Sequence, residues 1–157
     1  MAIINLRDEP RHLQTLAEWH QGEWAHLNPG ETLAMRIARM QHYLSVDLVP
    51  STFVYTHNGN ALGSAALVAS DMDTRPGLTP WLASVFVAPP FRRQGIGSAL
   101  VRHAMRQAEA AGISRLYLFT PDRAQFYQDL GWQTMSVDDY RDQAVTLMQV
   151  DLLRAGN

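Results

Sequence analysis

Hydrophobic side chains in the N-terminal third of the chain recur every three or four residues, the spacing of one helix face. A short apolar run at residues 2–6 precedes this pattern and predicts a first strand. Pro10 is suited to the first turn of the helix that follows. A second helix is expected over 33–44, after a break at Asn28-Pro29-Gly30.

From about residue 52 the pattern changes to short segments rich in β-branched, aromatic and small residues, separated by turn residues. Strands are predicted over 52–56, 61–69 and 81–87. Asn58-Gly59 lies between the first two and favours a tight hairpin turn. Gly63 lies inside the second strand, where a glycine often marks a bulge or a close approach of backbones.

The pattern returns to a helical period at Ile96, and Gly112 is placed to end that helix. A strand is predicted next, over 116–120. A strand, a helix and a strand within about 40 residues form a crossover connection, so the strands at 81–87 and 116–120 are expected to be parallel.

The last segment is expected to hold a short helix and two strands. Asp122 and Gln125 have the spacing of a capping box at a helix start. The strands are predicted over 132–137 and 144–152, separated by a polar loop at 138–143. The whole pattern predicts an α/β (α+β) fold, a mixed sheet with helices on its faces, in a single domain over 1–157.

Composition narrows the possible functions. Of the 157 residues, 46% are hydrophobic and 18% are charged, which is typical of a globular protein. The net charge of −2 argues against nucleic acid as a partner, since phosphate backbones require a basic face. The chain has no cysteine, which excludes disulfides, thiolate metal sites and cysteine nucleophiles. The six histidines show no metal-ligand spacing, so no metal is expected.

The most distinctive local feature is the turn between the strand at 81–87 and the helix that begins at Ile96. It reads Arg92-Arg93-Gln94-Gly95-Ile96-Gly97-Ser98. Free backbone N–H groups at a helix start, the helix dipole and two arginines together make a site for an anion such as a pyrophosphate. The alternative is a glycine-rich turn that merely connects the two elements.

Two common phosphate motifs do not fit this turn. A Walker P-loop requires Lys and then Ser or Thr after the last glycine, whereas Ser98-Ala99 follow Gly97. A dinucleotide fingerprint requires a third glycine, and Leu100 stands in its place.

The turn instead resembles the (Arg/Gln)-x-x-Gly-x-(Gly/Ala) signature of the GCN5-related N-acetyltransferase (GNAT) family. Tyr127-Gln128-Asp129-Leu130-Gly131-Trp132 is similar to a later segment of that family. The resemblance covers about 52–152 and implies a centrally splayed sheet. It also implies an acetyl-CoA-binding core over 52–152 and a variable helical region on the acceptor side over 1–50.

The resemblance implies which residues hold acetyl-CoA. Backbone N–H groups of the turn would bind the pyrophosphate, and the strand before the turn would pair with the pantetheine arm. The expected cofactor-binding residues are Val85, Phe86, Val87, Arg92, Arg93, Gln94, Gly95, Ile96, Gly97, Ser98, Thr120 and Tyr127.

The resemblance also implies catalytic roles. Tyr127 stands where the family often has a general acid for the departing thiolate, and a backbone N–H, such as that of Val85, would polarise the thioester carbonyl. The strand at 81–87 lacks the acid that many members carry, so a water held by Ser84 is one candidate base. Thr120 stands where the family often has Asn.

The sequence gives the least information about the residues that would bind the acceptor. Asp71 or Asp73 is expected to attract a cationic amine, with ordinary loop acids as the alternative. Trp24 and Trp81 are expected either to wall the acceptor pocket or to belong to the core.

The sequence therefore predicts an N-acetyltransferase that moves an acetyl group from acetyl-CoA to a primary amine by direct attack. A small-molecule acceptor is favoured over a protein N-terminus. The alternative is a non-catalytic acyl-CoA-binding sensor or regulatory module. No segment approaches the roughly 20 apolar residues of a membrane span, so a cytoplasmic protein without membrane or nucleic-acid partners is expected, possibly a homodimer.

Overall fold

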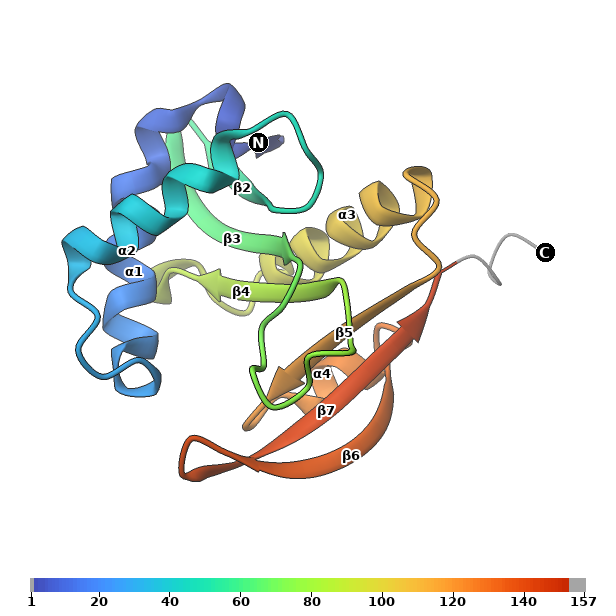
Figure 1. Ribbon diagram of the computed structural model, residues 1–157. Coiled ribbons are helices and arrows are strands. Elements are labelled where there is room, and N and C mark those ends of the chain that lie inside the picture. The colour runs from blue at the N-terminus through green and yellow to red at the C-terminus, as the bar shows by residue number, and fades with distance from the viewer. Residues whose placement is uncertain (1, 153–157) are drawn as a thin grey trace.

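The computed structural model describes residues 2–152 (Figure 1). Its strands are β1 (Ala2–Asn5), β2 (Ser51–His57), β3 (Asn60–Val68), β4 (Trp81–Val87), β5 (Arg115–Thr120), β6 (Gln133–Tyr140) and β7 (Gln143–Asp151). Its α-helices are α1 (Leu13–Trp24), α2 (Leu33–Met40), α3 (Ile96–Ala110) and α4 (Ala124–Gln128). Within this described range, no helix has both the length and the apolarity that crossing a membrane requires.

All seven strands form one sheet in the order β1-β2-β3-β4-β5-β7-β6. Neighbouring strands are antiparallel except β4 and β5, which are parallel, as the crossover pattern predicts. The only paired residues of these two strands are Trp81, the first residue of β4, and Tyr117, near the start of β5. They diverge beyond that point, so the sheet opens into two halves (Figure 1). The mixed, centrally splayed α/β architecture expected from the sequence is confirmed.

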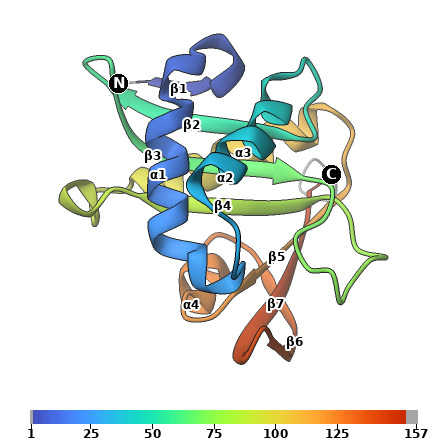
Figure 2. The same ribbon diagram turned by 60° about the vertical axis from the view of Figure 1, so that its left-hand side comes forward.

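Helices cover both faces of the β1–β4 half of the sheet. Figure 2 shows α1 and α2 in front of these strands and α3 behind them. The apolar face of α3, with Leu100, Val101 and Ala104, packs into a core that also includes residues from β5 and β7. Leu13, Leu16 and Met40 form a separate core beneath α1 and α2. Each helix therefore buries one apolar stripe against the sheet and leaves its polar face exposed.

One predicted boundary is wrong. The polar loop expected at 138–143 does not form, because β6 continues to Tyr140 and a two-residue turn at Arg141-Asp142 leads directly into β7. Both turn residues have positive φ, 50° and 67°, as a tight hairpin requires. β6 is an edge strand in which Asp139 is exposed, Asp138 is half-buried and Tyr140 is buried. The polar residues at the end of this edge strand resemble those of a loop, which explains the wrong boundary.

The predicted capping box at the start of α4 is also wrong. The helix has no side-chain cap from its own first turn. The hydroxyl of Thr120 at the end of β5 instead accepts hydrogen bonds from the backbone N–H groups of Asp122, at 3.4 Å, and Arg123, at 3.0 Å. Thr120 therefore fixes the turn that leads from β5 into α4.

Gly63 lies on β3 close to the backbone of β4 and to side chains of α3. A Cβ atom at this position would stand 2.8 Å from the carbonyl oxygen of Phe86 and 3.1 Å from a side-chain carbon of Leu100. The backbone of β4 could not move away without breaking its hydrogen bonds to β3. The close approach predicted from the sequence is thus confirmed.

Gly63→Ala is expected to destabilise the fold by about 1–3 kcal/mol through overpacking. Thermal unfolding should detect this as a drop in Tm of about 2–4 °C per kcal/mol. Gly22→Ala, inside α1, is the matched control because nothing lies within 4 Å of its added Cβ. That variant should gain about 0.5–1 kcal/mol from helix propensity. Equal changes in Tm for the two variants would contradict the packing argument.

Candidate functional site

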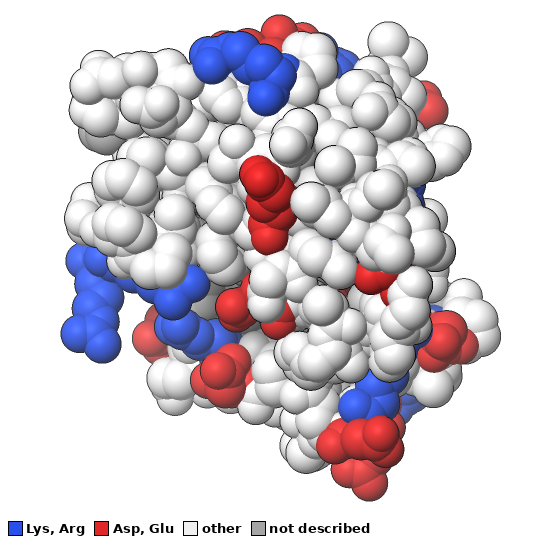
Figure 3. Space-filling view, turned by 90° about the vertical axis from the view of Figure 1, so that its left-hand side faces the viewer, with Lys and Arg blue, Asp and Glu red and all other residues white. Residues whose placement is uncertain are grey.

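A cavity of about 930 Å³ occupies the opening between β4 and β5. On the face shown in Figure 3, basic and acidic side chains gather around a hollow, and neither sign dominates. The predicted site residues that line the cavity are Trp24, Asp71, Asp73, Ser84, Val85, Phe86, Val87, Arg92, Arg93, Gly95, Ile96, Gly97, Ser98, Thr120 and Tyr127. Most of the residues singled out from the sequence therefore meet around one cavity.

Two predicted residues lie elsewhere. Gln94 is not part of the cavity wall. Trp81 is fully buried in a core cluster with Val68 and Leu147, and its indole N–H donates to the carbonyl of Leu78 at 2.6 Å. Of the two roles considered for Trp81, the structure gives it the one in the core.

The turn before α3 presents free backbone donors to the cavity. Gly95 precedes the helix with a φ of 83°, a left-handed conformation that favours glycine. The first intrahelical bond runs from Ala99 N to Gly95 O. The N–H groups of Ile96, Gly97 and Ser98 come before that bond and have no intrahelical acceptor. They form a helix N-terminus of the kind that binds anions.

Arg92 is anchored within the protein. Its Nε donates to the carbonyl of Val87 at 2.8 Å, and its guanidinium lies 5.4 Å from the centre of the Phe86 ring. The side chain thus bridges the end of β4 and the turn. Arg92 and Arg93 together keep positive charge at this end of the cavity.

β4 carries a bulge in the cavity wall. Ser64 pairs with Phe86 and Ala66 pairs with Ala83, so three steps along β4 match two along β3. Within the bulge, Ser84 has a φ of 54°, which is unusual for a residue other than glycine. Such bulges redirect backbone groups and occur often beside active sites.

A buried polar chain holds this bulge. The hydroxyl of Ser64 donates to the carbonyl of Ser84 at 2.8 Å, and Nε2 of His20 lies 2.9 Å from the same hydroxyl. Since the single hydroxyl proton goes to the carbonyl, His20 must donate through Nε2–H. Burial lowers the pKa of His20 to about 3, with smaller contributions from Arg36 and Arg39, so the imidazole is neutral. Sequence analysis missed this role, since His20 has only a helical spacing and Ser64 is one of several small residues in β3.

Ser64→Ala is expected to lower the rate of any reaction centred on the β4 bulge by about tenfold. It removes the group that fixes Ser84 and leaves a buried donor and acceptor unpaired, at about 1–3 kcal/mol. A double variant, Ser64→Ala with His20→Phe, also removes the orphaned donor. The double variant should recover part of the Tm but not the turnover rate. Recovery of both would show that the polar chain serves stability alone.

Tyr127 projects into the cavity from α4 and is 8% exposed. It contacts Phe126 and Trp132 edge to face, with ring centres 5.0 and 6.1 Å away. Burial raises the pKa of the phenol well above its ordinary value, and Asp122 adds to the effect while Arg123 opposes it. The side chain is therefore a protonated donor throughout the neutral range.

The opposite end of the cavity is lined by two acids and an aromatic side chain. Asp71 and Asp73 come from the β3–β4 loop, and Trp24 from the end of α1. Burial raises the pKa of Asp71 to about 6, although Arg39 and Arg141 both act to lower it. Asp73 is exposed and pairs with Arg141 at 3.2 Å. The two acids therefore differ in environment, and Asp71 has the pKa of a base poised for neutral pH.

Three arginines at this end of the cavity were not anticipated. Arg36 and Arg39 come from α2, and Arg141 from the β6–β7 turn. Their helical or turn context gave no indication of a shared site, because the three meet only in the folded chain. Among the described residues, no group of three or more His, Cys, Asp or Glu side chains is arranged to hold a metal ion.

Comparison with known families identifies the domain type. A family model described as "Acetyltransferase (GNAT) domain" matches residues 50–134, slightly more than half of the chain. An amino-acid acetyltransferase of Neisseria meningitidis is 26% identical over 130 residues. The match covers 80% of this chain but only 28% of that protein.

Solved structures of similar fold cover nearly the whole chain. An aminoglycoside 6'-N-acetyltransferase complexed with coenzyme A aligns with a TM-score of 0.76 at 16% identity, over 97% of each chain. The Salmonella typhimurium acetyltransferase yncA, solved with acetyl-CoA, aligns with a TM-score of 0.70 at 17% identity, over 97% of this chain and 94% of the other. At these identities the likeness establishes the shared fold.

Proposed function

Because this chain belongs to the GNAT acetyltransferase family, we propose that it moves the acetyl group of acetyl-CoA to a primary amine of a small molecule. The family membership confirms the acetyl-CoA-dependent transferase class expected from the sequence. The observation that carries the proposal further is the single cavity that joins three features. These are the free N–H groups before α3, the bulge at Ser84 and the protonated phenol of Tyr127.

These features suit direct attack of an amine on a thioester. The N–H groups of Ile96, Gly97 and Ser98 bind the pyrophosphate, and β4 orients the pantetheine arm. The bulge at Ser84 turns the N–H of Val85 toward the thioester carbonyl, where it stabilises the oxyanion that forms on attack. Tyr127 donates its proton to the departing thiolate, and Asp71 accepts the proton that the amine must lose.

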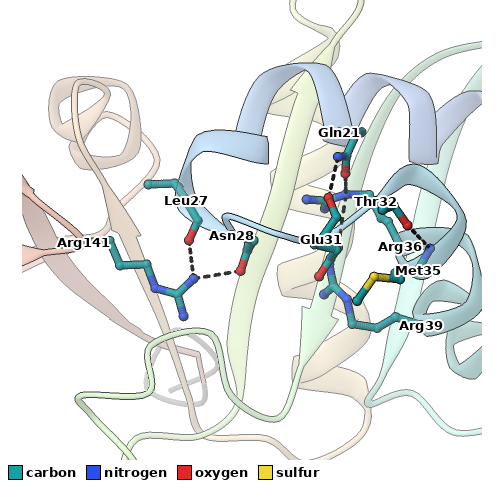
Figure 4. A network of polar contacts seen from close by, with 9 residues as sticks. All are labelled: Gln21, Leu27, Asn28, Glu31, Thr32, Met35, Arg36, Arg39 and Arg141. Carbon is teal, nitrogen blue, oxygen red and sulfur yellow. Dashed lines mark hydrogen bonds and ion pairs between the residues drawn. The ribbon is translucent and has the colours of Figure 1, made fainter.

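The acceptor end favours a small molecule. Arg141 donates to the carbonyl of Leu27, to Asn28 Oδ1 at 2.7 Å and to Asp73 at 3.2 Å. The first two contacts, drawn in Figure 4, join the β6–β7 turn to the α1–α2 segment, and the third joins it to the β3–β4 loop. Because three segments are held together at this end of the cavity, we expect it to accept a small molecule more readily than an extended protein chain.

The test is release of coenzyme A in the presence of acetyl-CoA and a panel of amines. Because the chain has no cysteine, a thiol-reactive reporter detects only the released coenzyme A. The chain also has no lysine, so acetylation of its own side-chain amines does not contribute. Turnover with at least one small amine is expected. Tight acetyl-CoA binding without turnover on any amine would instead support the alternative, a non-catalytic acyl-CoA-binding module.

A further inference from the structure

At the acceptor end of the cavity, positive charge is concentrated on the wall that α2 forms. Arg36 and Arg39 lie one turn apart on α2 and line the same wall. Figure 4 shows both extending from α2 toward the segment that connects α1 to α2, with Glu31 beside them. One oxygen of Glu31 serves both arginines, at 3.4 Å from Arg36 Nε and 2.8 Å from Arg39 Nη2. Two cations therefore share one carboxylate.

Arg36 is the more unusual of the two. Its side chain is almost fully buried, at 5% exposure, and its Nε donates to Gln21 Oε1 at 2.8 Å. Its Nη2 is sealed from solvent and has no hydrogen-bond partner. An unpaired donor on a buried cation costs more than the 1–3 kcal/mol typical of a neutral group. The fold retains this cost in the wall of the cavity.

Arg39 places a second positive charge at the surface of the cavity. Its side chain is 47% exposed, and it forms an ion pair with the carboxylate of Glu31. Burial acts to lower the pKa of Arg39, but the hydrogen bond to Glu31 raises it and Asp71 adds a smaller contribution, while Arg39 opposes the rise that burial causes in the pKa of Asp71. The pocket thus offers a cationic wall on α2 and a carboxylate on the β3–β4 loop within electrostatic reach of each other.

We propose that the acceptor is an amino-carboxylate, a small molecule that carries a carboxylate beside the amine that is acetylated. Arg39 binds the acceptor carboxylate through its planar guanidinium, which matches carboxylate geometry. Arg36 is a positioning residue whose buried charge supports that contact. The amine then lies on the Asp71 side, toward the β4 bulge. This inference rests on the proposed function.

The charge pattern disfavours a polycationic acceptor. A polyamine or an aminoglycoside would place an ammonium group beside Arg36 and Arg39, whose shared carboxylate, that of Glu31, already pairs with both. An acceptor with one ammonium and one carboxylate meets the opposite charge on each side. The relevant comparison is therefore between acceptors that differ by a single carboxylate.

The experiment uses pairs of amino acids and their primary amides, together with a polyamine and an aminoglycoside, in the coenzyme A release assay. An amide lowers the basicity of the neighbouring amine and so supplies more free base. A preference for the acid therefore cannot come from amine basicity. The best amino acid is expected to exceed its amide in kcat/KM by about tenfold or more, the value of one charge-assisted hydrogen bond.

Arg39→Gln should abolish most of that preference by raising KM for the amino acid, while KM for acetyl-CoA stays unchanged. Arg39→Lys should restore part of the preference, because it keeps the charge without the planar fork. Arg106→Gln, on the exposed face of α3, is the matched control. Equal or better turnover of amides or polycations overturns this inference and leaves the proposed function standing. Absence of turnover with every acceptor overturns both.

Discussion

Replacing Tyr127 with phenylalanine is expected to lower kcat by about 100-fold or more, the usual contribution of a general acid. The departing thiolate then has no nearby proton donor. Burial keeps the native phenol protonated across the neutral range, so the donor is always available in the wild type. Pre-steady-state and steady-state release of coenzyme A measure the effect. Titration of acetyl-CoA by calorimetry should give a Kd within about twofold of the wild type, because the ring still packs against Phe126 and Trp132.

Tyr117→Phe is the matched control for this variant. Tyr117 lies on β5 and packs against Trp81 with ring centres 5.9 Å apart, outside the cavity wall. Its loss of a hydroxyl should leave kcat unchanged. If Tyr127→Phe retained full kcat, the proton would come from solvent and the assigned role would be wrong. A parallel loss of acetyl-CoA affinity and kcat would indicate that the hydroxyl serves binding.

The part of the cavity that we propose binds acetyl-CoA could be placed from the sequence because it is local in sequence. The end of β4, the turn at 92–95 and the first turn of α3 are contiguous, so their residue types determine the geometry directly. Gly95 is required by a positive φ, and the free N–H groups follow from any helix start. Gly63 was informative for a similar reason, because an interior glycine in a strand has few explanations.

The rest of the cavity was not predictable because distant segments build it. His20 and Ser64 are 44 positions apart, and Arg141 reaches Asn28 across 113 positions. Neither pairing has a local signature, since each residue type also suits an ordinary helix, strand or turn. Arg36 illustrates the difficulty most clearly: on sequence it is a charge on an amphipathic helix, yet the fold buries it in the cavity wall.

The second large effect is expected at Asp71. Asp71→Asn removes the carboxylate that we propose as the base for the attacking amine, and kcat/KM should fall by about 100-fold. The wild type should lose activity as the pH falls through about 6, the pKa to which burial raises this carboxyl. The variant should lack that acidic limb. Asp73→Asn and His26→Asn are controls from the same cavity wall, and both should retain the limb.

The same substitution has an opposite effect on stability, which separates a catalytic role from a structural one. The folded pKa of about 6 lies above the ordinary value of 3.8, so the ionised carboxyl is less favourable in the folded protein than in the unfolded chain. Above pH 6 the group is ionised in both states and destabilises the fold, whereas well below pH 3.8 it is protonated in both and contributes nothing. Asp71→Asn should therefore raise Tm at pH 7.5 and change it far less at pH 3.5. A carboxylate kept for stability would give a lower Tm at pH 7.5, so a variant that is both slower and more stable identifies Asp71 as a group retained for the reaction.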